Sequence, residues 1–323
     1  MPVIQHVDYK PPILFRNNHL NTIYPFLFRN GIVPDYKRKR FDTGDGDFID
    51  LDTIFNSNNK LAILCHGLEG SSDSQYMRFT SQLLSENGWD VIAMNHRSCS
   101  GEMNRKIQMY HSGFTDDLHE VISTYEKDYE EVILAGFSLG GNMILKYTND
   151  GLFTLSPILT KVAAVSVPCD LAGCSEAISH WSNKVYDVRF LKTLLEKMVK
   201  KHEQFPDVVK KSDIEKVKTL KDFDEYFTGP LHGFSGAQEY YDRCNSLQFL
   251  GNVRIPTLLI NAQDDPFLSQ ESLPFEIAND SENLFFLSPK HGGHVGFSSW
   301  SKSYYWHERK ILEFVNEQVS FSI

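Results

Sequence analysis

The feature that most constrains the fold is the run VILAGFSLGG at residues 132–141. Its apolar start predicts a short buried strand, and residues 142–149 then repeat apolar side chains at helical spacing. Between them stands Ser138, with Gly136 and Gly140 two positions away on either side. A Cβ at either glycine would collide with the neighbouring strand and helix. The pattern therefore predicts a nucleophile elbow, a strained strand-to-helix turn that exposes the Ser138 hydroxyl.

Strand and helix patterns alternate on both sides of this turn. Further apolar runs predict strands at 61–66, 90–96, 161–168, 256–262 and 283–289, and amphipathic runs predict helices at 74–87, 115–127 and 304–319. Residues 36–56 predict a β-hairpin around Gly44-Asp45-Gly46. Such alternation is typical of an α/β protein whose mostly parallel sheet has helices on both faces.

The alternation stops after Pro168. Residues 169–250 carry helical patterns and many charges but no strand pattern. We expect residues 1–168 and 251–323 to form two parts of one core, with 169–250 inserted as a helical cap. Aromatic residues in the insertion either pack it against the sheet or line an acyl pocket. They are Trp181, Tyr186, Phe190, Phe223, Tyr226, Phe227, Phe234, Tyr240 and Tyr241.

Charge and apolar content bear on the partners of the chain. Its 42 acidic and 32 basic residues give a net charge of −10, which argues against nucleic acid or an anionic membrane surface as a partner. We interpret the basic run at 37–40 as the solvated edge of a strand. We find no signal peptide, no transmembrane run and no cysteine framework, and expect a cytoplasmic protein. Nothing in the sequence indicates an oligomeric state.

A serine at an elbow needs a base, and the base needs an acid to orient it. Asp264 and Asp265 follow the predicted strand at 256–262, and His291 and His294 follow the one at 283–289. The chain order Ser, Asp, His at strand ends is the one used by α/β-hydrolases. The sequence therefore predicts a Ser–His–Asp triad that includes Ser138.

Two choices remain inside this triad. We favour Asp265, because Pro266 turns the chain directly after it, with Asp264 as the alternative. We favour His294, because the two glycines before it let the loop fold back toward the serine, with His291 as the alternative.

An anion that develops on the substrate needs backbone N–H donors. We predict that Leu139, directly after the serine, and Leu68, in the loop after the strand at 61–66, supply this oxyanion hole. The spacing of His291 and His294 lacks the glutamate of an HExxH zinc motif. We therefore expect no metal ion and no cofactor.

Several longer motifs resemble one known family. They are HGLEGSSDSQYMR (66–78), NHRSCSGEMNR (95–105), GFSLGGN (136–142), NAQDDPF (261–267) and HGGHVGF (291–297), supported by NNHLNTIYPFLFR (17–29). Together they are similar to the YheT-like branch of the α/β-hydrolase superfamily, although Ser98 stands where a glycine is common. The resemblance implies the α/β-hydrolase fold and carboxylic-ester hydrolysis through Ser138, Asp265 and His294.

These observations predict a serine carboxylic-ester hydrolase that acts on short- to medium-chain esters or monoacylglycerol-like lipids. Two alternatives stay open: an acyltransferase that moves a medium-chain acyl group to an alcohol, and a non-catalytic ligand-binding protein of the same fold. A polar cluster in the loop after the strand at 90–96 is interpreted as a hydrogen-bond network that stiffens the loop, with head-group contact as the alternative. Its members are Arg97, Asn104, Arg105, Tyr110 and His111.

Overall fold

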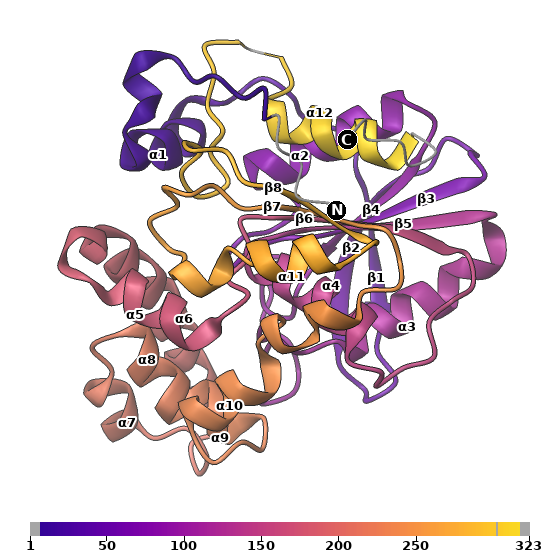
Figure 1. The fold of residues 1–323 in the computed structure, drawn as a ribbon. Coiled ribbons are helices and arrows are strands. Elements are labelled where there is room, and N and C mark those ends of the chain that lie inside the picture. The colour runs from indigo at the N-terminus through magenta and orange to yellow at the C-terminus, as the bar shows by residue number, and fades with distance from the viewer. Residues whose placement is uncertain (1–6, 302, 317–323) are drawn as a thin grey trace.

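A single eight-stranded sheet forms the centre of the computed structural model, which describes residues 7–301 and 303–316 (Figure 1). The strand order is β1-β2-β4-β3-β5-β6-β7-β8. The strands are β1(Lys37–Asp42), β2(Phe48–Ile54), β3(Lys60–Cys65), β4(Asp90–Asn95), β5(Glu131–Phe137), β6(Leu159–Val165), β7(Thr257–Ile260) and β8(Leu284–Leu287). The pairs β1–β2 and β2–β4 are antiparallel, and all the others are parallel. The prediction of a mostly parallel sheet is confirmed.

Helices cover both faces of this sheet, as Figure 1 shows. They are α2(Gln75–Glu86) and α12(Trp306–Asn316) on one face, and α3(Asp116–Tyr125), α4(Leu139–Asn149) and α11(Phe275–Asp280) on the other. Successive side chains of a strand point to opposite faces. Leu61 and Ile63 of β3 therefore pack with α3 and α4, whereas Leu64 packs with α2 and α12. A strand buried on both sides needs the unbroken apolar run that the sequence shows.

The closing helix differs slightly from its prediction. It begins at Trp306 rather than at residue 304, and it is described as far as Asn316. Residues 317–319 of the predicted helix lie outside the described residues.

Between β6 and β7 the chain leaves the sheet and forms a separate group of helices (Figure 1). They are α5(Leu171–Ser179), α6(Lys184–Gln204), α7(Lys211–Lys216), α8(Leu220–Phe223), α9(Gly229–Leu231) and α10(Ala237–Cys244), with the π-helix η4(Asp224–Thr228) between α8 and α9. Residues 169–250 thus hold helices and no strand, as their pattern predicts. An N-terminal helix, α1(Asn18–Phe28), contacts this group where Arg189 of α6 lies over the Phe26 ring.

The two charged features of the sequence have structural roles. The basic run forms the edge strand β1, where Arg38 and Arg40 pair with Asp52 and Asp50 of β2. The Arg97 guanidinium is buried in the loop after β4 and pairs with Asp117 at 2.6 Å and Asp45 at 3.0 Å. These contacts support the interpretation of a network that stiffens the loop.

Within the described residues, no helix combines the length and apolar character needed to cross a membrane.

Candidate active site

The turn between β5 and α4 has the strained geometry predicted for it. Ser138 has φ 53° and ψ −120°, in a region that side-chain-bearing residues rarely adopt. A Cβ built on Gly136 would lie 2.5 Å from the Gly140 carbonyl oxygen, and one built on Gly140 would lie 2.4 Å from the Cys65 carbonyl oxygen. Because these neighbours are backbone atoms, only glycine fits at either position.

We expect Gly140→Ala to lower the free energy of unfolding by about 1–3 kcal/mol or more, because overpacking against backbone cannot be relieved by a side-chain rotation. Gly251→Ala is the matched control, since a Cβ at Gly251 has no atom within 4 Å. The control should change the free energy of unfolding by less than about 0.5 kcal/mol. Urea denaturation of both variants measures the difference, and equal stabilities would contradict the role assigned to Gly140.

The loops after β7 and β8 bring a histidine and a carboxylate to this serine. His294 Nε2 lies 2.9 Å from Ser138 Oγ, and His294 Nδ1 lies 2.9 Å from Asp265 Oδ2. The Asp265 side chain is fully buried, and its Oδ1 also accepts a hydrogen bond from the Phe267 N–H at 2.9 Å. A neutral His294 that donates from Nδ1 to Asp265 leaves Nε2 free to accept the serine proton. The structure thus brings together Ser138, His294 and Asp265.

The alternative residues of the sequence analysis lie beside this group and contact each other. His291 Nδ1 is 3.1 Å from Asp264 Oδ2, and the Gly293 N–H donates to Asp264 Oδ1 at 3.0 Å. Burial raises the pKa of the Asp264 carboxyl. Asp264 therefore holds the backbone of the loop that carries His294, and its contact is with His291 rather than with the histidine next to the serine.

Helix α1 supports the same loop, which the sequence reasoning did not predict. The His294 N–H donates to Thr22 Oγ1 at 2.9 Å, and that hydroxyl donates to the Asn18 carbonyl at 2.8 Å. The Asn18 side chain donates in turn to the Asp264 carbonyl at 3.0 Å. The signal available in the sequence was the family motif at 17–29, which indicates no particular contact.

The two backbone donors predicted for an anion lie next to the serine. Leu139 is the first residue of α4, so its N–H has no acceptor within the helix. Leu68 lines the cavity that contains Ser138, and its N–H has no hydrogen-bond partner among residues 7–301 and 303–316. The neighbouring N–H groups are occupied, since Gly67 donates to the Tyr76 hydroxyl at 3.0 Å and Glu69 to the Tyr110 hydroxyl at 2.8 Å.

A buried ion pair ties this loop to the helical insertion. Lys197 of α6 lies 2.7 Å from Glu69 Oε1, and both side chains are largely buried. The Tyr110 hydroxyl donates to the same Glu69 oxygen at 2.8 Å. Glu69 follows Leu68 directly, so α6 helps to hold the Leu68 N–H in place. This contact was also missed, because a lysine on a charged helix normally indicates a solvated face.

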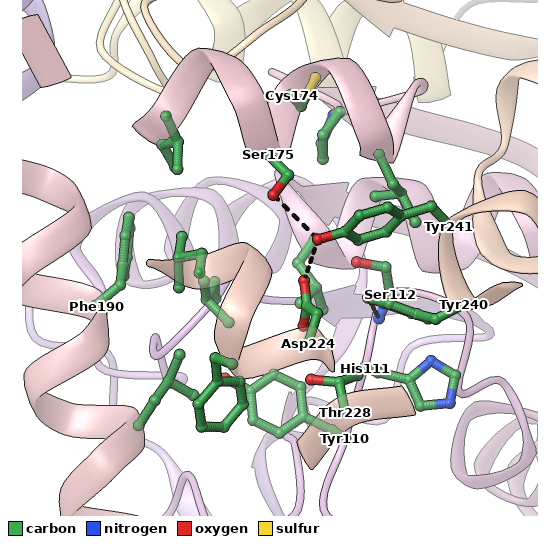
Figure 2. Close-up of a pocket in the computed structure, with 18 of the residues that line it drawn as sticks. Tyr110, His111, Ser112, Cys174, Ser175, Phe190, Asp224, Thr228, Tyr240 and Tyr241 are labelled. Atoms are coloured by element: carbon green, nitrogen blue, oxygen red, sulfur yellow. Dashed lines mark hydrogen bonds between the residues drawn. The ribbon is translucent and has the colours of Figure 1, made fainter. Parts of the chain in front are cut away.

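Ser138 and His294 border two cavities of different character. One lies under the helical insertion and has mostly apolar walls (Figure 2), formed by residues that include Ile178, Phe190, Leu194, Phe223 and Phe227. The other lies toward α1 and adds the charged residues Glu69, Asp73, Arg78 and Arg189. Several aromatic residues of the insertion line the first cavity, among them Phe190, Tyr240 and Tyr241, whereas Trp181 is 81% exposed. The serine therefore stands between an apolar and a more polar space.

Comparison with known sequences identifies relatives over nearly the whole chain. A family model described as alpha/beta hydrolase fold matches residues 61–163. The Escherichia coli protein named "Putative esterase YheT" is 32% identical, covering 88% of this chain and 85% of its own. Human "Phospholipase ABHD3" is 27% identical over 98% of this chain and 80% of its own, and human "Monoacylglycerol lipase ABHD2" is 25% identical over 96% and 80%.

Solved structures share the fold at lower sequence identity. The Pyrococcus furiosus esterase Pf2001 superposes with a TM-score of 0.58 at 17% identity, over 87% of this chain and 90% of the esterase. An esterase from Exiguobacterium antarcticum gives a TM-score of 0.56 at 14% identity, over 87% of this chain and 100% of the esterase. At such identities the likeness shows the fold alone.

Proposed function

The chain belongs to the α/β-hydrolase family, in the branch that contains YheT, and is a carboxylic-ester hydrolase; we propose that Ser138, His294 and Asp265 carry out its reaction as a catalytic triad. The observation that carries this proposal is the continuous hydrogen-bonded line from the serine hydroxyl through the imidazole to a buried carboxylate. Its first distance, 2.9 Å between Ser138 Oγ and His294 Nε2, is within reach for direct proton transfer.

In the proposed reaction, Ser138 Oγ attacks the ester carbonyl while His294 Nε2 takes its proton. Asp265 holds the imidazole in the required tautomer and stabilises the positive charge that forms on it. His294 then gives the proton to the leaving alcohol, and the acyl group remains on Ser138. Water, activated by the same imidazole, releases the acid and restores the serine.

The negative charge on the carbonyl oxygen needs donors that are already in place. We propose the N–H groups of Leu68 and Leu139 for this role, because both lie beside Ser138 and neither has an acceptor in the part of the chain that the structure describes. The loss of one such donor typically costs about 10²–10³ in rate. The ion pair between Glu69 and Lys197 would then act on catalysis indirectly, by positioning the Leu68 N–H.

We assign the acyl chain of the substrate to the apolar cavity and the alcohol part to the more polar one. Burial of methylene groups against apolar walls favours this orientation. Residues 169–250 would act as a cap that closes over the acyl chain, with 1–168 and 251–323 as the two parts of the core. The names of the relatives support acyl esters of lipid type, such as monoacylglycerols, as substrates.

An acyl cavity bounded by the helical insertion predicts a limit on chain length. We expect kcat/KM for p-nitrophenyl esters to rise by about fourfold per methylene, equivalent to about 0.8 kcal/mol each, until the cavity is full. It should then fall, so that short- to medium-chain esters are preferred over palmitoyl. Initial rates across the series from acetyl to palmitoyl, with the free acid identified as product, test this. The fastest turnover on the palmitoyl ester would contradict a cap that closes over the chain.

A further inference from the structure

A group of polar side chains interrupts the apolar wall of the proposed acyl cavity. Asp224, Thr228, Ser175 and Tyr241 line it together with the large apolar side chains of the insertion (Figure 2). All four belong to the insertion: Ser175 to α5, Asp224 and Thr228 to η4, and Tyr241 to α10. An acyl chain made only of methylene groups offers these polar groups nothing to bind.

The hydrogen bonds within this group converge on the carboxylate. The Tyr241 hydroxyl lies 2.8 Å from Asp224 Oδ2 and 3.0 Å from Ser175 Oγ (Figure 2). A phenol has one proton, and the shorter contact to the charged acceptor takes it, so the Ser175 hydroxyl donates to Tyr241. A carboxylate can accept about four hydrogen bonds. Tyr241 and Thr228 are the donors beside Asp224 in the described part of the chain. The Asp224 carboxylate therefore still has unused acceptor capacity.

The carboxylate of Asp224 lies in the wall of a mostly apolar cavity. No lysine, arginine or histidine among the described residues forms an ion pair with it. Burial raises the pKa of its carboxyl to about 6, against the lowering effect of the hydrogen bonds from Thr228 and Tyr241. At pH 8 the group is ionised, and a further hydrogen-bond donor would offset part of its desolvation cost.

The backbone at this point is also unusual. Asp224 begins the five-residue π-helix η4, and π-helical turns are rare and occur frequently at functional sites. The wider turn places Asp224 and Thr228 on the cavity wall together. A π-helical turn, a carboxylate with unused acceptor capacity and the wall of the substrate cavity thus coincide.

We propose that this polar group binds a hydroxyl on the acyl chain, so that esters of hydroxylated fatty acids are the preferred substrate class. The inference rests on the proposed function, because it takes this cavity as the acyl site. A neutral hydroxyl supplies a further donor to Asp224 at a smaller desolvation cost than an ammonium group. A site built around a hydrogen bond to a substrate hydroxyl discriminates strongly against the analogue that lacks it.

The test compares ethyl octanoate with ethyl hydroxyoctanoates whose hydroxyl is moved one carbon at a time along the chain. Released acid is measured by chromatography at pH 8, corrected for the uncatalysed reaction. We expect one hydroxyl position to give a kcat/KM at least about tenfold above that of ethyl octanoate. Asp224→Leu should remove this preference, so that the ratio of kcat/KM for the hydroxylated ester to kcat/KM for ethyl octanoate falls to about one.

Tyr241→Phe is the matched control, because it breaks the link between η4 and α10 but keeps the carboxylate. It should retain the preference for the hydroxylated ester. If the cluster only holds the cap together, both variants will lower the rates on all esters alike, which overturns the proposal. Should Asp224→Leu fail to fold, Asp224→Asn, which keeps an acceptor for Tyr241, is expected to reduce the preference severalfold.

Two further outcomes distinguish failure of this inference from failure of the proposed function. A wild-type enzyme that hydrolyses ethyl octanoate as fast as every hydroxylated ester overturns the proposed binding of a hydroxyl but leaves the triad intact. A protein that hydrolyses none of these esters overturns the proposed function, and this inference with it.

Discussion

Replacement of Ser138 by alanine is expected to lower kcat for ester hydrolysis by at least about 10³-fold, and by up to about 10⁶-fold. Without its Oγ no acyl-enzyme can form. Any remaining activity would come from direct attack of water on an ester whose carbonyl oxygen is bound by the oxyanion donors. Rates on a p-nitrophenyl ester of short chain, measured at equal protein concentration, give the ratio.

A fluorophosphonate probe separates loss of the nucleophile from loss of the fold. The wild type should be labelled covalently and Ser138→Ala should not. Ser112→Ala is a suitable control, because Ser112 lines the same cavity and the hydrogen bonds of its backbone with Tyr240 and Asn142 remain in the variant. This variant should be labelled as fast as the wild type. Equal labelling of Ser138→Ala would show that another residue is the nucleophile.

The second large loss of activity is expected for Asp265→Asn, which should lower kcat by about 10⁴-fold. An asparagine amide would donate to His294 Nδ1, which forces the imidazole proton onto Nε2. That nitrogen could then no longer accept the proton of Ser138, even though the geometry would be preserved.

Asp264→Asn provides the matched comparison at the neighbouring position. Asp264 contacts His291 and the Gly293 N–H, so its loss should slacken the loop and cost less than about tenfold in kcat. Parallel measurement of kcat for both variants, with their thermal midpoints, tests the assignment. A larger loss for Asp264→Asn than for Asp265→Asn would reverse the roles of the two carboxylates.

Most of the fold could be predicted because its signals are local. A strand buried on both faces requires an unbroken apolar run, as in β3 and β5, and the turn at Ser138 requires glycine at 136 and 140 because backbone atoms touch there. The helices between β6 and β7 were expected for the same reason, since the alternation of strand and helix patterns stops after Pro168 and returns near residue 256.

The candidate site was also predicted in part from local signals. The carboxyl ends of parallel strands meet at one edge of the sheet, so the residues that follow β5, β7 and β8 come together there. These residues are Ser138, then Asp264 or Asp265, then His291 or His294. The sequence did not decide between Asp264 and Asp265 or between His291 and His294. Nearby residues in a loop point in different directions, and the local pattern does not determine which of them faces the serine. The tertiary structure brings Asp265 to His294 and Asp264 to His291.

The sequence by itself thus determined the sheet, its elbow and the strand ends where chemistry could occur. Only the tertiary structure decided what surrounds them: Thr22 beneath the His294 loop, Lys197 against Glu69, and Asp224 in the wall of the apolar cavity. The physical reason is separation along the chain. Periodicity and turn chemistry act over a few residues, whereas these contacts join residues 272 and 128 positions apart. Such contacts form only when complete elements pack against each other.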